Sequence, residues 1–199
     1  MNNMKILVAK DEAFNFIYRA NIDELTNYGK VEFFSPLHDN CEVDCDLLYL
    51  PGGYPELFQK EIAANRQMTE RIRNFAKNGG RIFAECGGFM YLCNRIDSTE
   101  MCNVLPFKAT MKDARLHLGY RTMNILSANG GEMILKGHEF HYSEVQDTDA
   151  PGIEKLCCQR SAKGIAVNTA IYKYKNIAAG YTHWYWAETG FPFFLINNE

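Results

Sequence analysis

The chain has 199 residues, of which 47% are hydrophobic and 23% are charged, and its formal net charge is −3. This length fits one compact domain with enough core to fold without disulfides or metals, so we predict a single domain over residues 1–199. The small negative charge gives no reason to expect a nucleic acid or an anionic membrane as a partner, and no apolar run approaches the length of a membrane span.

Apolar runs in the first half predict the strands of a parallel sheet. Strand-like segments cover residues 5–9, 31–34, 46–50 and 81–85. Apolar residues at helical spacing predict one helix over 11–28, ended by Gly29, and a mostly helical segment over 56–77, in one or two pieces, ended by 78–80. Continuous apolar strands that alternate with helices are typical of an α/β fold with a parallel central sheet and helices on both faces.

The second half follows a different pattern, with short β-like segments separated by turn residues. These segments cover 116–126, 132–135, 139–145, 164–167, 170–174 and 176–181, and turns are expected at 130–131, 151–152 and 175–176. We predict that these strands form antiparallel additions to the sheet. No linker or repeat divides the chain.

The strongest functional signal is the segment around Cys86. An apolar run over 81–85 leads into this cysteine, and Gly87, Gly88 and a helix-like pattern follow it. The order strand, nucleophile, glycine-rich turn and helix is that of a nucleophile elbow, here with sulfur as the nucleophile. We expect the helix N-terminus to lower the thiol pKa and to present N–H groups to an oxyanion. A cysteine at a strand end can instead be a small buried apolar residue, but the glycine pair favours acyl transfer through a thioester.

A second glycine pair lies in the segment 51–56, with the sequence Pro-Gly-Gly-Tyr-Pro-Glu. It follows another predicted parallel strand, and ligands bind at the carboxyl ends of the strands in open α/β sheets. Gly52 and Gly53 free their backbone N–H groups for an oxyanion hole. An ordinary Pro-Gly turn explains the segment equally well by itself, and the cysteine elbow favours the ligand-binding interpretation.

A thiol nucleophile needs a base, and the chain has five histidines. His183 lies at the end of a late strand among aromatic residues that could exclude water. His138 and His141 lie near a strand start, while His38 and His117 fit structural or solvated positions. The residues alone do not choose between His183 and His141 as the base.

The seven cysteines give an odd count with no paired spacing that suggests a disulfide framework. Cys157-Cys158 and Cys41-x-x-x-Cys45 do not match zinc-ligand spacing, so we predict no metal site. The first residues enter a strand-like run at once, which predicts no signal peptide. Together these features predict a reduced, cytoplasmic protein.

Five motifs occur in order along the chain. They are residues 51–56, Ala-Glu-Cys-Gly-Gly-Phe-Met-Tyr-Leu at 84–92, Leu-Gly-Tyr-Arg at 118–121, Gly-His-Glu-Phe-His-Tyr-Ser at 137–143 and Ala-Gly-Tyr-Thr-His at 179–183. Together they resemble the glutamine amidotransferase domain of cobyrinic acid a,c-diamide synthases, and the resemblance covers essentially the whole chain. It implies the flavodoxin-like fold of class I glutamine amidotransferases.

The resemblance also implies roles for particular residues. Cys86 would be the nucleophile and His183 the base, and the backbone N–H groups around Gly53 and Gly87 would form the oxyanion hole. The residues implied to lie near the glutamine are Gly52, His141, Tyr142 and Ser143. Many related amidotransferases carry a glutamate two residues after the histidine, where this chain has Tyr185. Members of this family work with a Cys-His pair and without that glutamate. The sequence therefore does not show what orients the imidazole of His183.

The implied reaction is hydrolysis of glutamine, with the ammonia passed to an ATP-dependent amidation of corrinoid carboxylates in cobalamin biosynthesis. The chain has no G-x-x-x-x-G-K-[ST] motif, so we expect no cofactor in it, and ATP and magnesium in a synthetase domain or partner subunit. The alternatives are the same chemistry for another acceptor (cobyric acid, a nickel-sirohydrochlorin or a cell-wall lipid precursor) or a non-catalytic interaction domain. The presence of both Cys86 and His183 argues against the non-catalytic alternative.

Overall fold

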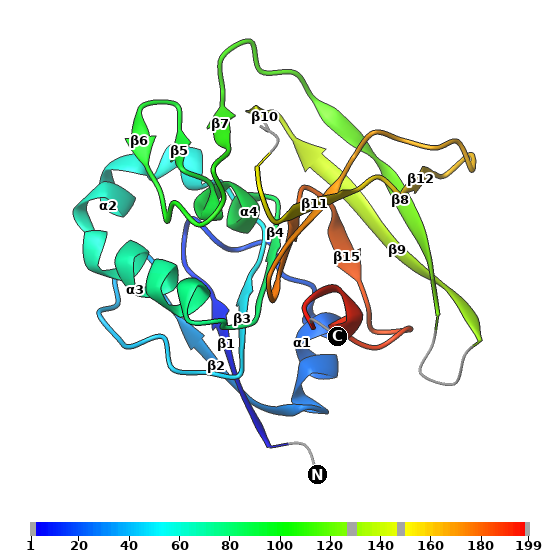
Figure 1. The fold of residues 1–199 in the computed structure, drawn as a ribbon, viewed down its shortest axis with the longest axis horizontal. Helices are drawn as coiled ribbons and strands as arrows, with labels where there is room; N and C mark the ends of the chain where they lie inside the picture. The colour runs from blue at the N-terminus through cyan, green and yellow to red at the C-terminus, as the bar shows by residue number, and fades with distance from the viewer. Residues whose placement is uncertain (1–2, 127–130, 147–149, 198–199) are drawn as a thin grey trace.

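A mixed seven-stranded sheet forms the centre of the molecule (Figure 1). The computed structural model describes residues 3–126, 131–146 and 150–197. The strand order is β11-β13-β14-β4-β3-β1-β2. The parallel strands are β1 (Met4–Ala9), β2 (Gly29–Phe34), β3 (Leu47–Leu50), β4 (Ile82–Glu85) and β14 (Ile177–Gly180). Two antiparallel strands, β13 (Ile171–Tyr174) and β11 (Ile153–Leu156), extend the sheet beyond β14. The predicted strands of the first half and the α/β class are therefore confirmed.

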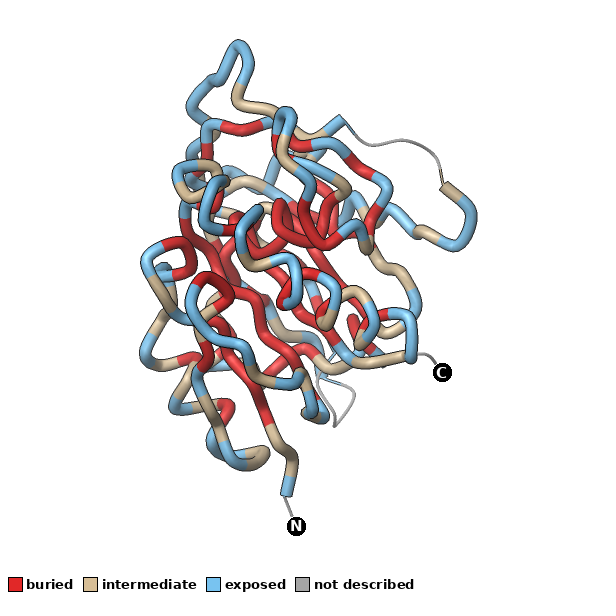
Figure 2. Tube along the Cα trace, turned by 90° about the vertical axis from the view of Figure 1, so that its left-hand side faces the viewer, coloured by how far each residue is buried: buried red, intermediate tan, exposed pale blue. Residues whose placement is uncertain are grey.

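Alternate residues of the central strands face two separate cores. In β1, Leu7 and Ala9 belong to one buried cluster, whereas Ile6 and Val8 belong to the other, as the two-residue period of a strand requires. The helices α2 (Gln59–Ala64), α3 (Arg66–Lys77) and α4 (Gly87–Leu92) contribute to the first core. The helix α1 (Arg19–Thr26) and the turn η2 (Phe193–Leu195) contribute to the second. Figure 2 shows the buried segments running through the interior, with exposed turns around them.

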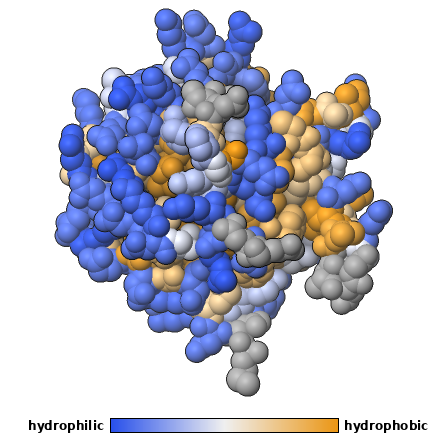
Figure 3. Space-filling model, in the orientation of Figure 1, coloured by the Kyte–Doolittle hydropathy of each residue, from blue (hydrophilic) through white to orange (hydrophobic). Residues whose placement is uncertain are grey.

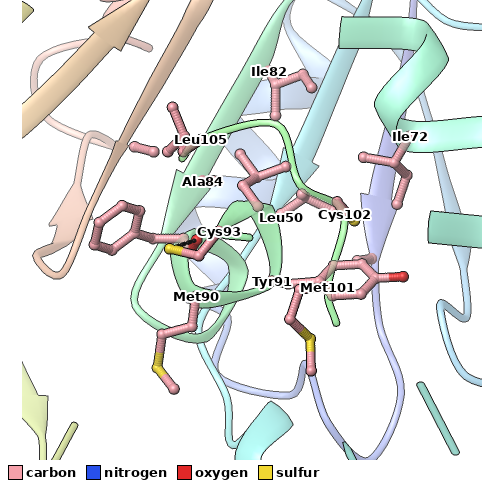
Figure 4. Packing of buried hydrophobic residues seen from close by; sticks show 14 of the residues in the cluster. Leu50, Ile72, Ile82, Ala84, Met90, Tyr91, Cys93, Met101, Cys102 and Leu105 are labelled. Atoms are coloured by element: carbon pink, nitrogen blue, oxygen red, sulfur yellow. Dashed lines mark hydrogen bonds between the residues drawn. The ribbon is translucent and has the colours of Figure 1, made fainter. Parts of the chain in front are cut away.

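The first core encloses α4, the helix that follows the predicted nucleophile. All six residues of α4 are buried. Figure 4 shows Met90 and Tyr91 of this helix among Leu50, Ile72 and Ile82, which come from two strands and α3. Packing on this scale fixes the position of α4 against the sheet far more strongly than the helix propensity of a six-residue segment could.

The antiparallel strands of the second half form more than an extension of the central sheet. The strands β8 (His117–Leu126) and β9 (Glu132–His141) pair along ten residues each, and a second sheet joins them to β12 (Arg160–Ser161) and β15 (His183–Tyr185). The residues of this sheet that enter the second core include Met123, Ile125, Leu135 and Trp184. A third sheet contains β10 (Glu144–Gln146), β7 (Lys108–Thr110), β5 (Arg95–Ile96) and β6 (Thr99–Glu100). The prediction of antiparallel additions to the central sheet holds for β13, whereas β14 joins that sheet parallel to β4 and the segment of β11 was not predicted as a strand.

The first helix is shorter than the predicted segment 11–28, because Asp11 starts a turn instead. Its Oδ1 accepts hydrogen bonds from the N–H groups of Ala13 and Phe14, at 2.9 and 3.1 Å. Its Oδ2 accepts from the Ser35 hydroxyl and the Leu37 N–H, at 2.8 and 3.0 Å. Side-chain hydrogen bonds of this kind compete with helix formation, so the helix begins only at Arg19.

Other element boundaries also differ from those expected. The segment 56–77 contains a 3-10 turn, η1 (Pro55–Leu57), and two helices that meet at Asn65. The strands expected over 132–135 and 139–145 are instead β9, which is continuous to His141, and β10. The segment 164–167 contains only an isolated bridge between Ala166 and Arg160. The turn residues Gly152 and Lys175 have positive φ, as a tight turn requires, while Gly130 of the expected turn at 130–131 lies outside the described residues. Within the described ranges, no helix is both long and apolar enough to cross a membrane.

We expect Trp186→Ala to lower the free energy of unfolding by about 3–5 kcal/mol, because it removes a large, fully buried side chain from the second core. The indole packs against Tyr49, Phe83 and Phe191, with ring centroids 5.2–5.5 Å away. Chemical denaturation measures the loss. The control is Leu57→Ala at a side chain that is 72% exposed, which should change stability by less than about 0.5 kcal/mol. Equal losses in the two variants would contradict this description of the core.

Candidate active site

Cys86 occupies a sharp turn between β4 and α4. Its φ of +46° and ψ of −105° are unusual for a residue with a side chain. The turn is held on both sides: the Cys86 N–H donates to the Gly180 carbonyl at 2.8 Å, and the Met90 N–H donates to the Cys86 carbonyl at 3.0 Å. Such a conformation persists only where the surrounding structure determines it, and it is found at functional sites. The predicted elbow is therefore present.

The glycine pair after Cys86 is required by the close approach of α4 to the loop that follows β3. The Gly88 N–H donates to the Pro51 carbonyl at 3.0 Å, and a Cβ at Gly88 would lie 2.1 Å from the Leu50 carbonyl oxygen. A Cβ at Gly87 would lie 2.7 Å from the Gly53 carbonyl oxygen. A side chain at either position would therefore push the two loops apart.

Two backbone N–H groups lower the pKa of the Cys86 thiol. They belong to Gly87, in the elbow, and Gly53, in the loop after β3. Gly53 cannot carry a side chain, because a Cβ there would lie 2.0 Å from the Ala13 carbonyl oxygen. The two groups predicted for the oxyanion hole thus lie together at the nucleophile, although their role in catalysis stays a prediction.

Burial controls the ionisation of Cys86. Burial first, and then the carboxyl groups of Glu56 and Glu85, raise the pKa of the thiol to about 12, against the opposing effect of the two N–H groups. The expectation of a lowered thiol pKa is therefore wrong in its net direction: the Gly87 N–H lowers the pKa, but burial of a residue that is only 4% exposed outweighs it. Cys86 is a neutral thiol at neutral pH.

His183 begins β15 and lies in the same buried region. Its ring stacks on His138 at 5.0 Å and contacts Phe16 at 4.5 Å, between ring centroids. Burial, and then the neighbouring His138 and His141, lower the pKa of His183 to about 3, so the imidazole is neutral. Its Nδ1 has no hydrogen-bond partner among the described residues. The ring lies directly over Gly52, where a Cβ would be 2.1 Å from its Cε1 atom, so Gly52 makes room for the imidazole.

Cys86 and His183 open onto one cavity of about 320 Å³ with largely apolar walls. The residues around it are Phe16, Gly53, Tyr54, Cys86, Leu118, His138, Phe140 and His183. The sequence interpretation missed Phe16, Leu118 and Phe140. Leu118 and Phe140 face each other across the hairpin of β8 and β9, and the Phe140 carbonyl lies 3.9 Å from the sulfur. The alternation of Phe140 with the buried polar residues Glu139 and His141 was the signal that could have identified this side chain.

The other predicted glutamine-site residues lie beside this cavity rather than around it. His141 and Ser143 line a second cavity of about 420 Å³. The His141 ring is stacked between His117 and Tyr181, with centroids at 4.7 and 3.7 Å, and burial lowers its pKa to about 4. The hydroxyl groups of Ser143 and Tyr181 are 2.9 Å apart, while Tyr142 is 42% exposed. A role for these three residues in glutamine binding stays a prediction.

Aromatic packing supports the His183 ring where a carboxylate is missing. Tyr185 occupies the position of the usual glutamate, and its ring packs edge-on against Tyr18 at 5.5 Å. The Tyr18 hydroxyl hydrogen-bonds Nδ1 of His138 at 2.7 Å, and His138 stacks on His183. Tyr185 therefore supports the imidazole of His183 indirectly, through the rings of Tyr18 and His138, and not by a direct hydrogen bond.

Glu188, the acidic residue nearest to His183 in the later sequence, does not reach the imidazole. Its carboxylate pairs with Lys136 at 3.0 Å, and both side chains are 61% exposed. Across the described ranges, no group of three histidine, cysteine or acidic side chains could hold a metal ion.

Comparisons with known proteins agree with this geometry. The chain matches the CobB/CobQ-like glutamine amidotransferase domain family over residues 5–191. It is 39% identical over 186 residues to a cobyrinate a,c-diamide synthase of Methanosphaera stadtmanae, and 41% identical over 187 residues to one of Methanobrevibacter smithii. Each match covers 90% of this chain but only 40% and 41% of those proteins, so the chain spans about two fifths of their length.

A solved structure shares the fold. A GMP synthase component from Thermoplasma acidophilum superposes with a TM-score of 0.59 and 15% identity, over 98% of this chain and 94% of the other. At this identity the likeness concerns the fold alone. It confirms the predicted amidotransferase fold, including the mixed sheet with antiparallel strands at one edge.

We expect alkylation of Cys86 by iodoacetamide to accelerate about tenfold for each pH unit from pH 7 to pH 9, because only the thiolate reacts. With a pKa of about 12, the rate constant should reach no plateau in this range. Mass spectrometry of the peptide that contains Cys86 measures the rate, and Cys86→Ala identifies the signal. A plateau below about pH 8 would show a thiol activated at rest and would contradict the burial argument.

Proposed function

Because the chain belongs to the CobB/CobQ-like glutamine amidotransferase domain family, we propose that it is the glutamine-hydrolysing part of a cobyrinate a,c-diamide synthase. The observation that carries the proposal is the common cavity of Cys86 and His183, with the N–H groups of Gly53 and Gly87 at the sulfur. The named relatives support the acceptor, since both are cobyrinate a,c-diamide synthases.

The reaction begins when the Cys86 sulfur attacks the side-chain amide carbon of glutamine. The carbonyl oxygen becomes an oxyanion that accepts hydrogen bonds from the Gly53 and Gly87 N–H groups. His183 takes the thiol proton and delivers it to the amide nitrogen, so that the C–N bond breaks and ammonia leaves. Water then hydrolyses the glutamyl thioester to glutamate and restores the thiol.

The resting protonation states fix the order of the proton steps. Cys86 is a thiol and His183 is a neutral imidazole, because burial shifts the pKa of each away from an ion pair. The thiol proton therefore moves during the attack on bound glutamine and not before it. The free chain is a weak glutaminase in this scheme, and binding of substrate or a partner accelerates it.

The ammonia is used in an ATP-dependent amidation of corrinoid carboxylates, in a synthetase domain or subunit that binds ATP and magnesium. The chain itself lacks the phosphate-loop motif, and its matches cover about two fifths of the named relatives. The same glutaminase chemistry could serve cobyric acid, a nickel-sirohydrochlorin or a cell-wall lipid precursor, and the names of the relatives favour the a,c-diamide product. A cytoplasmic location fits an enzyme that uses glutamine and ATP.

The synthetase part is proposed to cover the hairpin of β8 and β9. Hydrophobic side chains gather on this side of the molecule, whereas the side with α2 and α3 is mostly hydrophilic (Figure 3). Near the cavity, Leu118 is 64%, Tyr120 73% and Tyr142 42% exposed. A partner on this face would bury these side chains and keep ammonia from escaping into solvent.

We expect a diazo-ketone analogue of glutamine to label one cysteine per chain, at Cys86, and to leave Cys86→Ala unlabelled. His183→Ala should slow labelling about 100-fold through loss of the base, whereas His141→Ala should slow it less than about threefold. Intact-mass and peptide mass spectrometry measure both results.

No labelling of the wild-type chain, even in the presence of the synthetase part of a relative, would reject the glutaminase function. If His141→Ala abolished labelling and His183→Ala did not, the assignment of the base would be wrong. A non-catalytic interaction domain predicts no labelling in any variant.

A further inference from the structure

We propose that Glu85 is a positioning residue that holds the backbone of β15, and with it His183, beside Cys86. The inference rests on the proposed glutaminase function and adds a residue to its machinery. Glu85 directly precedes Cys86 in sequence, but its side chain points to the face of the sheet opposite to that of the Cys86 side chain, as alternation along β4 requires.

The contacts of the Glu85 carboxyl group connect the two catalytic strands. Its Oε1 accepts a hydrogen bond from the N–H of Trp184 at 2.9 Å, and its Oε2 accepts one from the Tyr49 hydroxyl at 2.7 Å. Trp184 follows His183 directly. One side chain thus ties the residue next to the nucleophile to the residue next to the base, in a site where Glu85 is only 2% exposed.

The strand β15 needs such a contact because it pairs with another strand on one edge only. It has three residues and pairs with β9, with Trp184 opposite Gly137. On its other edge, Asn21 donates from Nδ2 to the Trp184 carbonyl at 2.7 Å, and accepts at Oδ1 from the Trp186 N–H at 3.1 Å. Side chains of Glu85 and Asn21 therefore replace the missing neighbouring strand. Without Glu85 the buried Trp184 N–H would lose its partner.

A buried acid at this position is costly, which indicates that its hydrogen bonds matter. Burial raises the pKa of Glu85 to about 8, while the Trp184 N–H and the Tyr49 hydroxyl oppose the rise. An apolar side chain would avoid the cost of burying a carboxyl group but could not accept from Trp184. In the variant Glu85→Gln, the side-chain oxygen can still accept from Trp184 and the amide nitrogen can donate to the Tyr49 oxygen. This variant therefore separates hydrogen bonding from charge.

Two sets of contacts orient His183. Stacking on His138 and the tilted contact with Phe16 set the plane of the ring, and the contact of Glu85 sets the backbone from which the ring projects. A displacement of about 1 Å in a catalytic group can cost about 100-fold in rate, so loss of the backbone contact should act on the chemical step. It should leave binding of the glutamine analogue largely intact, because Glu85 does not line the cavity.

The test measures labelling by the diazo-ketone analogue at several concentrations, which separates the maximal rate constant from the half-saturating concentration. We expect Glu85→Ala to lower the maximal rate constant at least about tenfold, with the half-saturating concentration within about twofold of wild type, and Glu85→Gln to stay within about threefold for both. Ile177→Ala is the matched control: it empties a fully buried site at the amino end of β14, opposite Ile82 and so at the end of the sheet away from Cys86, and it should label at the wild-type rate in its folded state.

A wild-type rate in Glu85→Ala, an equal loss in Glu85→Gln, or a change in half-saturation alone would overturn the proposal. If Glu85→Ala does not fold, Glu85→Met fills the buried site with an apolar side chain that cannot accept from the Trp184 N–H, and it gives the same test. Amide hydrogen exchange at Trp184 provides a readout that does not need catalysis. Exchange should be faster in Glu85→Ala and unchanged in Glu85→Gln. Absence of labelling in the wild type would reject the glutaminase function, and the exchange rates would still test the role of Glu85.

Discussion

The close approach of two backbone segments at the carboxyl ends of β3 and β4 is the constraint on which the site depends. Because these strands are parallel neighbours, their following loops leave the sheet side by side. The hydrogen bond from Gly88 to Pro51 joins the loops, and glycines at the contact leave no room for anything larger than hydrogen. The N–H groups of Gly53 and Gly87 meet at one sulfur as a result. The positions of Cys86, of the Gly53 and Gly87 N–H groups and of the space for the imidazole all follow from this contact.

Burial gives the site its chemical character. The walls of the cavity are largely apolar, and the pKa values of Cys86 and His183 shift in opposite directions, each toward the neutral form. Fixed backbone dipoles in such a site interact strongly with charge that develops during a reaction, because little water screens them. The protein therefore stores its catalytic capacity in orientation and not in a reactive ion pair. Aromatic rings and a buried carboxyl group, Glu85, provide that orientation.

Local patterns were sufficient to predict the parallel strands, the elbow at Cys86 and the loop at Gly52 and Gly53, since each rests on residues adjacent in sequence. Long-range contacts decided the rest. Asp11 delays the start of the first helix to Arg19, partly through partners more than twenty residues away, and Phe16 in the segment before the helix lines the cavity. The hairpin of β8 and β9 forms its own sheet, in which Met123, Ile125 and Leu135 face the second core while Leu118 and Tyr120 are exposed on the other face. Burial decided the pKa of the thiol. Because burial depends on the whole fold, an argument from the helix terminus alone could not predict it.

The burial of Cys86 also affects how well the protein resists oxidation. Peroxide and other oxidants attack thiolates, so a thiol with a pKa of about 12 that is 4% exposed is almost inert to them. The exposed pair Cys157 and Cys158 lies on the surface and meets oxidants first. If Cys86 is the nucleophile, as proposed, its burial keeps it reduced between turnovers. The same burial that slows the resting chemistry thus preserves the catalyst.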